Sequence, residues 1–385
     1  METIHILVVC AVTVGWLCLC CLTTDADEQS ALGAPLETDP DSGAQVYLLG
    51  GDPRPADNIY GEQPYSDASG RRIAIRYYSH DGMTGGLNVF DLYDGSSHEI
   101  VSEEPLFPPF HPWGEYLYFL QRTDRDLTLR RCRYQEPDRI EDIALLPPER
   151  GEYSYGTMSP DHRWYAVAVR PEGAAGHRVE LLDLQTEQWQ VLLEMDGYHA
   201  KHEQFSRDGR NRVLIQLNKL PDVEQVLLGE ISLDGHFVLF PADRMWTPRP
   251  TGHECWIGET NRIFYSTRMD ERAGTNIFIG AAGDEAAKPV SGPGPHIGHV
   301  AVSKCGRYWV GDTSEDGIPI YIGNLESERC KRFVFSRTVY DGNQWAHAHP
   351  YLTADNKWLI FTARRGEQLP QVYGARLPEG WLDEL

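Results

Sequence analysis

Short runs of hydrophobic residues alternate with polar turns along this chain, and the same arrangement returns seven times. Each copy has a polar turn of the Ser-Pro-Asp-Gly kind, followed by a run of β-branched and aromatic residues such as Ile73-Ala74-Ile75. Runs of this composition, bounded by turn residues, are typical of buried strands. No long stretch keeps a helical period, so the pattern predicts an all-β protein. The seven turns are centred on Gly70, Gly114, His162, Gly209, Thr260, Gly306 and Asn356.

The spacing of these turns predicts the architecture. Successive turns lie 44 to 51 residues apart, and a repeat of this length that holds several short strands is typical of a propeller blade. We therefore predict a seven-bladed β-propeller. The seventh repeat ends near residues 371–375, too early to complete a blade, whereas an unassigned strand at residues 45–49 precedes the first repeat. We expect this N-terminal strand to complete the last blade and leave no unpaired edge.

The N-terminal segment predicts export. Residues 6–22 are apolar and precede the acidic sequence Thr-Thr-Asp-Ala-Asp-Glu, which is typical of a secretory signal rather than a spanning helix. We assign residues 1–24 to a signal peptide, 25–43 to an acidic flexible tether and 44–385 to the propeller. The protein is then expected in the periplasm or outside the cell, with no membrane span in the mature chain.

Alternatives to a cleaved signal stay open, because the first five residues contain no Lys or Arg. An uncleaved anchor would tether the N-terminus to a membrane. A lipidated cysteine among Cys18, Cys20 and Cys21 would do the same, and a start codon elsewhere would remove the segment from the protein.

The net charge of −22 argues against a nucleic-acid partner, which needs a basic surface. It favours a soluble enzyme or a binder of small molecules.

Histidines recur at one phase of the repeat. The residues seven positions before each turn are Gln63, Phe107, Tyr155, His202, His253, His299 and His349. With 14 histidines in 385 residues, chance would place fewer than one at seven given positions. The first strand of each blade faces the propeller axis, so equivalent positions of neighbouring blades form a ring at one depth. The four histidines are therefore expected to meet at one end of the axis.

A metal site is predicted where blade seven begins. His347 and His349 are two residues apart, which in an extended segment puts both imidazoles on one face. Gln344 adds a carbonyl oxygen, and His299 comes from the neighbouring blade. A set of imidazole and oxygen ligands without thiolate suits Mn, Fe, Co or Ni and does not exclude Zn. One histidine at a blade entry is more often structural, but the pair together with His299 favours a divalent metal.

Three segments resemble a known family. The motif Gln344-x-x-His347-x-His349-Pro350, the segment Gly252-His253-Glu254-x-Trp256 and the His299 segment ending in Val310-Gly311-Asp312 are similar to those of oligogalacturonate lyases, family 22 of the polysaccharide lyases. The resemblance covers residues 44–385 and is specific in blades five to seven.

The resemblance implies a set of roles. One Mn²⁺ ion would be bound by His299, Gln344, His347 and His349, and His253 would be the Brønsted base. The reaction would be β-elimination on an oligouronate substrate, in which a 4-linked uronate loses its C5 proton and its C4 substituent. A divalent cation on the uronate carboxylate stabilises the developing charge, while neutral His253 takes the proton from across a substrate-sized gap.

The sequence departs from the family pattern in two respects. The family carries an arginine on a blade-four strand about two dozen residues before the base, whereas residues 224–228 read Glu-Gln-Val-Leu-Leu here. Arg244 and Arg249 are the candidates to replace this charge, and His202 is a third candidate for substrate binding. Family members also usually lack a leader and act inside the cell.

Three classes of function therefore compete. The first is a metal-dependent lyase of short uronate-containing oligosaccharides. The second is a non-catalytic propeller of the TolB kind that binds a protein or a sugar, which needs no phased histidines. The third is a different metal-assisted activity on the same scaffold, such as hydrolysis or another sugar lyase. Bound metal and turnover of an oligouronate discriminate among them.

Overall fold

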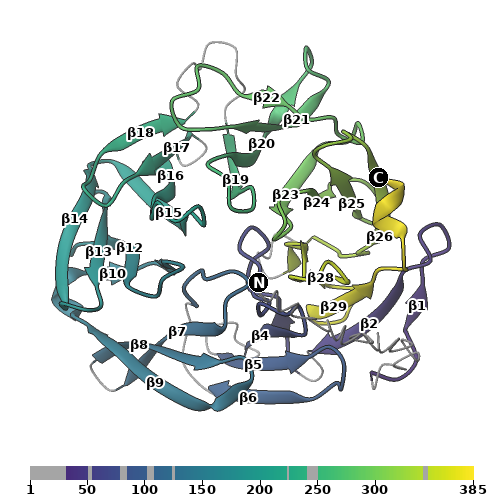
Figure 1. Cartoon of the computed structure of the whole chain (residues 1–385), viewed down its shortest axis with the longest axis horizontal. Helices are drawn as coiled ribbons and strands as arrows, with labels where there is room; N and C mark the ends of the chain where they lie inside the picture. The colour runs from purple at the N-terminus through teal and green to yellow at the C-terminus, as the bar shows by residue number, and fades with distance from the viewer. Residues whose placement is uncertain are drawn as a thin grey trace, which may run out of the picture.

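Seven sheets surround a common axis in the structure of this chain (Figure 1). The structure, a computed structural model, describes residues 32–50, 54–78, 85–101, 108–123, 126–222, 225–240, 250–340 and 346–385. The expected signal peptide lies outside the described residues. The prediction of an all-β, seven-bladed propeller is confirmed.

The blades follow one another in chain order, each running from the axis outward. Blade one holds β3 (Ala56–Asp57), β4 (Arg72–Tyr78), β5 (Gly85–Asp91) and β6 (Ser97–Val101), and blade two holds β7 (Tyr116–Thr123), β8 (Asp126–Arg133) and β9 (Glu136–Leu146). Blade three holds β10 (Glu152–Tyr153), β11 (Thr157–Met158), β12 (Trp164–Arg170), β13 (His177–Asp183) and β14 (Gln188–Met195). Blade four holds β15 (Tyr198–Phe205), β16 (Val213–Lys219), β17 (Val226–Ile231) and β18 (Phe237–Phe240).

The remaining blades follow the same plan. Blade five holds β19 (Pro250–Trp256), β20 (Ile263–Asp270), β21 (Thr275–Gly280) and β22 (Lys288–Pro289), and blade six holds β23 (Ile297–Val302), β24 (Tyr308–Thr313), β25 (Pro319–Asn324) and β26 (Cys330–Phe335). Blade seven holds β27 (Tyr351–Leu352), β28 (Trp358–Ala363), β29 (Gln371–Arg376), β2 (Gln45–Gly50) and β1 (Glu37–Thr38). Two short 3₁₀ turns, η1 (Pro148–Arg150) and η3 (Trp381–Glu384), are also present. In the described part of the chain, no helix has the length and apolar character needed to cross a membrane.

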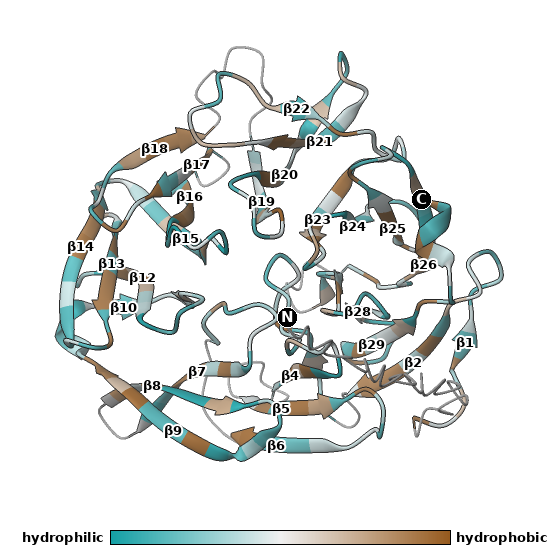
Figure 2. Cartoon of the chain, viewed as in Figure 1, coloured by the Kyte–Doolittle hydropathy of each residue, from teal (hydrophilic) through white to brown (hydrophobic). Residues whose placement is uncertain are grey.

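The hydrophobic core lies between neighbouring blades. In β12, Tyr165 and Val167 pack toward blade two, whereas Ala166 and Ala168 pack toward blade four. Both faces of a middle strand are thus buried, which explains why these strands read as unbroken apolar runs. In Figure 2 the hydrophobic segments fall mainly on strands and the turns are mostly hydrophilic.

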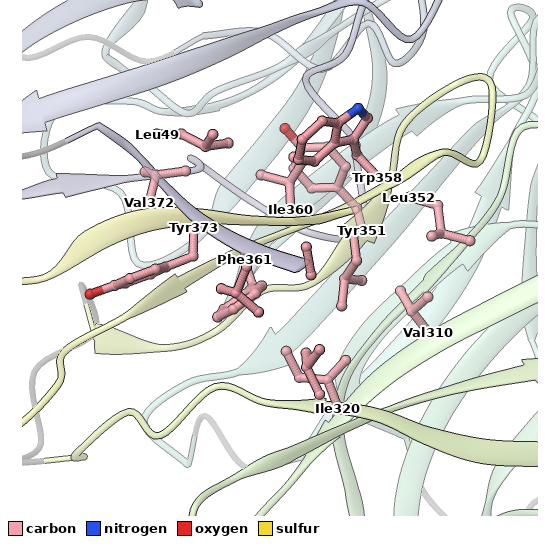
Figure 3. Packing of buried hydrophobic residues seen from close by; sticks show 14 of the residues in the cluster. Leu49, Val310, Ile320, Tyr351, Leu352, Trp358, Ile360, Phe361, Val372 and Tyr373 are labelled. Atoms are coloured by element: carbon pink, nitrogen blue, oxygen red, sulfur yellow. The ribbon is translucent and has the colours of Figure 1, made fainter. Parts of the chain in front are cut away.

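The ring is closed by the N-terminal strand, as the sequence predicts. β2 pairs antiparallel with β29, with Tyr47 opposite Gly374. Figure 3 shows side chains of β2, β24, β25, β27, β28 and β29 gathered in one cluster around this closure. β1 then adds a fifth strand, with Glu37 opposite Val46. Blade seven therefore includes β1, which lies before residue 44 and within the segment that the sequence predicts to be a flexible tether. The backbone groups of β1 form hydrogen bonds with the outer edge of β2.

Candidate metal and acid–base centre

The predicted histidines lie where the innermost strands are irregular. The pairing register slips once in each of β15, β19 and β23, and His202, His253 and His299 lie at these slips. Bulges bend a strand and redirect its side chains, and they are frequent beside active sites. His202 and His349 also have positive φ angles of 58° and 41°, which are uncommon outside glycine. The shared phase in the sequence thus corresponds to a shared irregularity near the axis.

His299, His347 and His349 form a compact cluster. One nitrogen of each imidazole lies within 4.8 Å of those of the other two. His347 Nδ1 is 3.1 Å from His299 Nε2, and the ring centroids of His299 and His349 are 4.4 Å apart. The structure therefore brings together three of the four residues that the sequence predicts as metal ligands. The fourth, Gln344, lies outside the described residues.

Asp312 of β24 fixes the orientation of His299. The carboxylate accepts a hydrogen bond from His299 Nδ1 at 2.9 Å and one from the His299 backbone N–H at 2.8 Å. Tyr340 donates its hydroxyl proton to Asp312 Oδ2 at 2.9 Å. With Nδ1 bonded in this way, His299 Nε2 faces the other two histidines. A carboxylate behind a histidine is the usual arrangement around protein-bound metals.

The electrostatics of the cluster suit a cation. Burial, and then the neighbouring His299, lower the pKa of His347 to about 4 and that of His349 well below its ordinary value. Burial opposes a charged His299, but the charge and hydrogen bond of Asp312 raise the pKa of His299. His347 and His349 are therefore neutral, as metal ligands must be. Asp312 stabilises positive charge at His299 Nε2, so the three imidazoles are a favourable ligand set for a cation.

One buried atom supports this fit. His349 Nε2 is buried and has no hydrogen-bond partner among the described residues. A buried polar atom without a partner costs about 1–3 kcal/mol, so such atoms in proteins usually bind a water, an ion or a ligand. The described cluster consists of three imidazoles and contains no thiolate. It therefore fits a divalent cation.

His253 contacts this cluster from blade five. Its ring centroid is 4.5 Å from that of His299, so the predicted base packs directly against a candidate ligand. Its Nδ1 lies 2.6 Å from Glu62 Oε1, and the Glu62 side chain is only 1% exposed. Burial and His299 lower the pKa of His253, although Glu62 acts in the opposite direction.

Glu62 belongs to a segment of blade one that crosses the axis. Residues 58–63, here called the crossing segment, connect β3 with the next turn, and Figure 1 shows the purple chain reaching the middle of the ring. Asn58 Nδ2 donates to the His349 carbonyl at 2.7 Å, and Gln63 Nε2 donates to Gln204 Oε1 of blade four at 2.6 Å. A Cβ on Gly61 would lie 2.6 Å from the His349 carbonyl carbon, so only glycine fits there.

His202 contacts the crossing segment at Tyr60 and does not belong to the three-histidine cluster. Its Nε2 is 2.8 Å from the Tyr60 hydroxyl, and its Nδ1 is 3.5 Å from Glu254 Oε1. Arg244 and Arg249, the other two residues predicted to bind substrate, lie outside the described residues. Phe107, the blade-two residue of the same repeat phase, lies outside them as well.

The sequence reasoning missed the acidic partners. Asp312 stands in an otherwise apolar strand, which is a signal for a buried functional carboxylate. Glu62 and Tyr60 lie in a segment without periodicity, and nothing in the sequence indicates that it crosses the ring. Glu254 follows His253 directly, so its burial depends on the bulge in β19.

Fold and site define a class: an all-β seven-bladed propeller with a histidine cluster and buried carboxylates at its axis. A scan of the sequence against protein-family models finds no match, and a sequence search among curated proteins finds none.

Similar solved structures do exist. An oligogalacturonate lyase in complex with manganese has a TM-score of 0.71 and 19% identity, over 90% of this chain and 96% of that one. The oligogalacturonate lyase of Vibrio parahaemolyticus has a TM-score of 0.66 and 17% identity over the same shares. The β-propeller domain of the Trilobed protease from Pyrococcus furiosus has a TM-score of 0.50 and 11% identity, over 83% of this chain and 95% of that one. At these identities the likeness shows the fold.

Proposed function

We propose that this protein is a metal-dependent lyase that cleaves short uronate-containing oligosaccharides, of the oligogalacturonate type, by β-elimination. One observation carries the proposal: a three-histidine cluster that fits a divalent cation is in ring contact with His253, whose Nδ1 is bonded to the buried Glu62. A cation site beside an oriented neutral base is what removal of a proton next to a carboxylate requires. The similarity in fold to two oligogalacturonate lyases supports the proposal.

The proposed ligands are His299, His347 and His349, with Gln344 as the fourth. Manganese is the proposed metal, since imidazole and amide oxygen are ligands that Mn²⁺ accepts and one similar structure is a manganese complex. A divalent cation bound there would stabilise the negative charge that develops on the uronate carboxylate as the C5 proton leaves.

His253 is the proposed base. Its Nδ1–H donates to Glu62, which leaves the lone pair on Nε2 available for the C5 proton. Because burial and His299 lower the pKa of His253, the ring is neutral at neutral pH. Glu62 then stabilises the imidazolium that forms, as a carboxylate does in a catalytic triad.

Substrate binding and location complete the proposal. We assign contacts with the sugar to His202, Arg244 and Arg249, and we place the protein outside the cytoplasm with residues 1–24 removed. N-terminal sequencing of the mature protein tests the second assignment. A chain that still begins at Met1 in the cytoplasm would exclude it.

The decisive experiment combines elemental analysis with an assay of oligouronates, in which the 4,5-unsaturated product is detected by its ultraviolet absorbance. The wild type is expected to bind one divalent metal and to cleave an oligouronate. The double variant His347→Ala/His349→Ala is expected to lose both. The variant His253→Ala is expected to keep the metal but to lose turnover by about 10²-fold or more, the usual scale for a general base.

A matched control is another histidine pair of this chain. His177 and His199 stack with centroids 4.3 Å apart at the junction of blades three and four, and they take no part in the proposed site. The variant His177→Ala/His199→Ala should keep metal and activity. Unchanged metal content in the His347→Ala/His349→Ala variant would exclude the metal site, and loss of metal from His253→Ala would make His253 a ligand.

A further inference from the structure

Tyr340 is an exposed aromatic residue in a chain that otherwise covers its aromatic rings. It is 39% exposed, whereas every other described tyrosine, phenylalanine and tryptophan is buried or half-buried. The other exposed large hydrophobic residues of the described chain are not aromatic. Contact between an aromatic ring and water is unfavourable, and the proposed metal site and base make no use of this ring.

The position of Tyr340 connects it with the candidate metal ligands. Its ring centroid is 5.0 Å from that of His347, and the two planes meet at 62°. Its hydroxyl donates to Asp312 Oδ2 at 2.9 Å, and Asp312 is only 1% exposed. A tyrosine usually buries its ring and keeps its hydroxyl in water. Here the hydroxyl is bonded to a buried carboxylate, so the exposed surface of Tyr340 is mainly that of the ring.

The backbone before Tyr340 is held against blade seven. The Val339 N–H donates to the Arg364 carbonyl at 2.8 Å. The Thr338 hydroxyl donates to the Ala346 carbonyl at 2.7 Å and accepts from the Arg364 N–H at 3.0 Å. Together with the hydroxyl bond to Asp312, these contacts hold the ring from both ends. A ring that is fixed before a ligand arrives loses little conformational entropy when the ligand binds.

A pyranose ring suits such a surface. A uronate carries its hydroxyl and carboxylate groups around the rim, while parts of both faces consist of C–H groups that pack well on an aromatic ring. In the proposed function, the cation binds the carboxylate and His253 takes one proton. Neither group distinguishes a sugar acid from another carboxylate of similar size. An exposed ring beside the ligands can supply this recognition.

We propose that Tyr340 is a specificity-determining residue whose ring packs against a pyranose ring of the bound oligouronate. This inference rests on the proposed function and adds to it the recognition of the sugar body. Packing of this kind is the same before and during the reaction. It therefore contributes to KM and not to kcat.

The test compares two variants that both lack the hydroxyl. Tyr340→Phe keeps the ring, whereas Tyr340→Leu removes it, so any effect of the lost bond to Asp312 is common to both. Relative to Tyr340→Phe, Tyr340→Leu is expected to raise KM for the oligouronate about tenfold with similar kcat and equal metal content. Tyr93→Leu is the control, because the Tyr93 hydroxyl contacts Asp355 at 3.5 Å and its ring lies outside the proposed site.

A second measurement needs no turnover. Dissociation constants of galacturonate and of acetate are measured by NMR titration of the metal-loaded protein. Both ligands carry a carboxylate, but only galacturonate has a pyranose ring. The wild type and Tyr340→Phe are expected to bind galacturonate about tenfold more tightly than acetate, and Tyr340→Leu is expected to lose this preference.

The outcomes separate this inference from the proposed function. A wild type that cleaves the oligouronate, with equal KM in Tyr340→Leu and Tyr340→Phe, would reject the role of Tyr340 and leave the lyase in place. An equal preference for galacturonate in the two variants would reject it as well. A wild type that prefers galacturonate through Tyr340 but cleaves no oligouronate would reject the lyase and retain the sugar contact.

Discussion

At the scale of single residues, the site depends on carboxylates that hold histidines in one tautomer. Asp312 binds His299 Nδ1 and Glu62 binds His253 Nδ1, so in both rings Nε2 is left for chemistry. In the proposed function, His299 is a metal ligand and His253 is a base because of the groups that face each Nε2, and not because the two rings differ. Asp312 and Glu62 therefore indicate the functional site as clearly as the histidines do.

Glu62→Gln tests the partner of the base. The amide preserves the shape of the side chain but removes the charge that raises the pKa of His253. Turnover is expected to fall by at least about tenfold, with metal content and KM unchanged. In the wild type, activity is expected to decline as pH falls through the lowered pKa of His253, because protonated imidazole cannot accept a proton.

The pH profile of Glu62→Gln shows the direction in which the pKa of His253 changes when the charge is removed. Without the Glu62 charge, the pKa of His253 drops further, so the acid limb of kcat/KM should move to lower pH. An acid limb that moves upward, or one that stays in place, would show that Glu62 does not act through His253. Glu230→Gln, which neutralises another buried carboxylate that is bonded to Arg212 in blade four, is the matched control.

At the scale of elements, the crossing segment determines the site more than any strand does. It contributes Tyr60 and Glu62 and contacts blades four, five and seven. Gly61 makes this possible, since a Cβ there would lie 2.6 Å from the His349 backbone.

Gly61→Ala is therefore expected to displace the segment from blade seven. Overpacking of this kind costs about 1–3 kcal/mol, so the folded ring should survive while turnover falls with Tyr60 and Glu62 misplaced. Gly292→Ala is the control, because the nearest atom to its added Cβ would be the Thr275 hydroxyl oxygen at 3.2 Å, on the third strand of blade five. The free energy of unfolding from chemical denaturation and the turnover are measured for both variants. Full activity in Gly61→Ala would show that the crossing segment accommodates the added Cβ without displacing Tyr60 and Glu62.

The strands and the crossing segment differ in how far they can be predicted from the sequence. Alternation and repeat length predict the blades, and the shared phase of His253, His299 and His349 predicts residues that meet, because both signals are periodic. His202 has the same phase but contacts Tyr60 instead of the cluster. The crossing segment has no period, and Glu62 is 191 residues from His253. Its contacts follow only from the closed ring, which no local pattern encodes.

At the scale of the whole molecule, closure depends on the N-terminal strands. Asp39, which follows β1, accepts a hydrogen bond from Arg332 of blade six at 2.6 Å. Burial opposes the charge of Asp39, but Arg332 and two backbone N–H groups outweigh it, so the pKa of Asp39 is lowered. This anchor fastens the outer edge of blade seven to its neighbour.

Asp39→Asn should destabilise the fold by about 1–3 kcal/mol at neutral pH. Because the folded-state pKa lies below the unfolded one, the contribution of Asp39 is present above the ordinary range of an aspartate and is lost as pH falls through the lowered value. The variant should therefore lose less stability on acidification than the wild type. Thermal unfolding at several pH values measures this, with Asp316→Asn, an exposed aspartate between β24 and β25, as the control.

The pairing of β2 with β29 has a consequence for biosynthesis. β2 leaves the ribosome among the first strands, and its only partner along that edge is made more than 300 residues later. Until then Val46, Tyr47 and Leu49, all buried in the finished ring, belong to an open strand edge that other chains can join. We therefore expect the chain to be most prone to aggregation in the interval between synthesis of β2 and synthesis of β29.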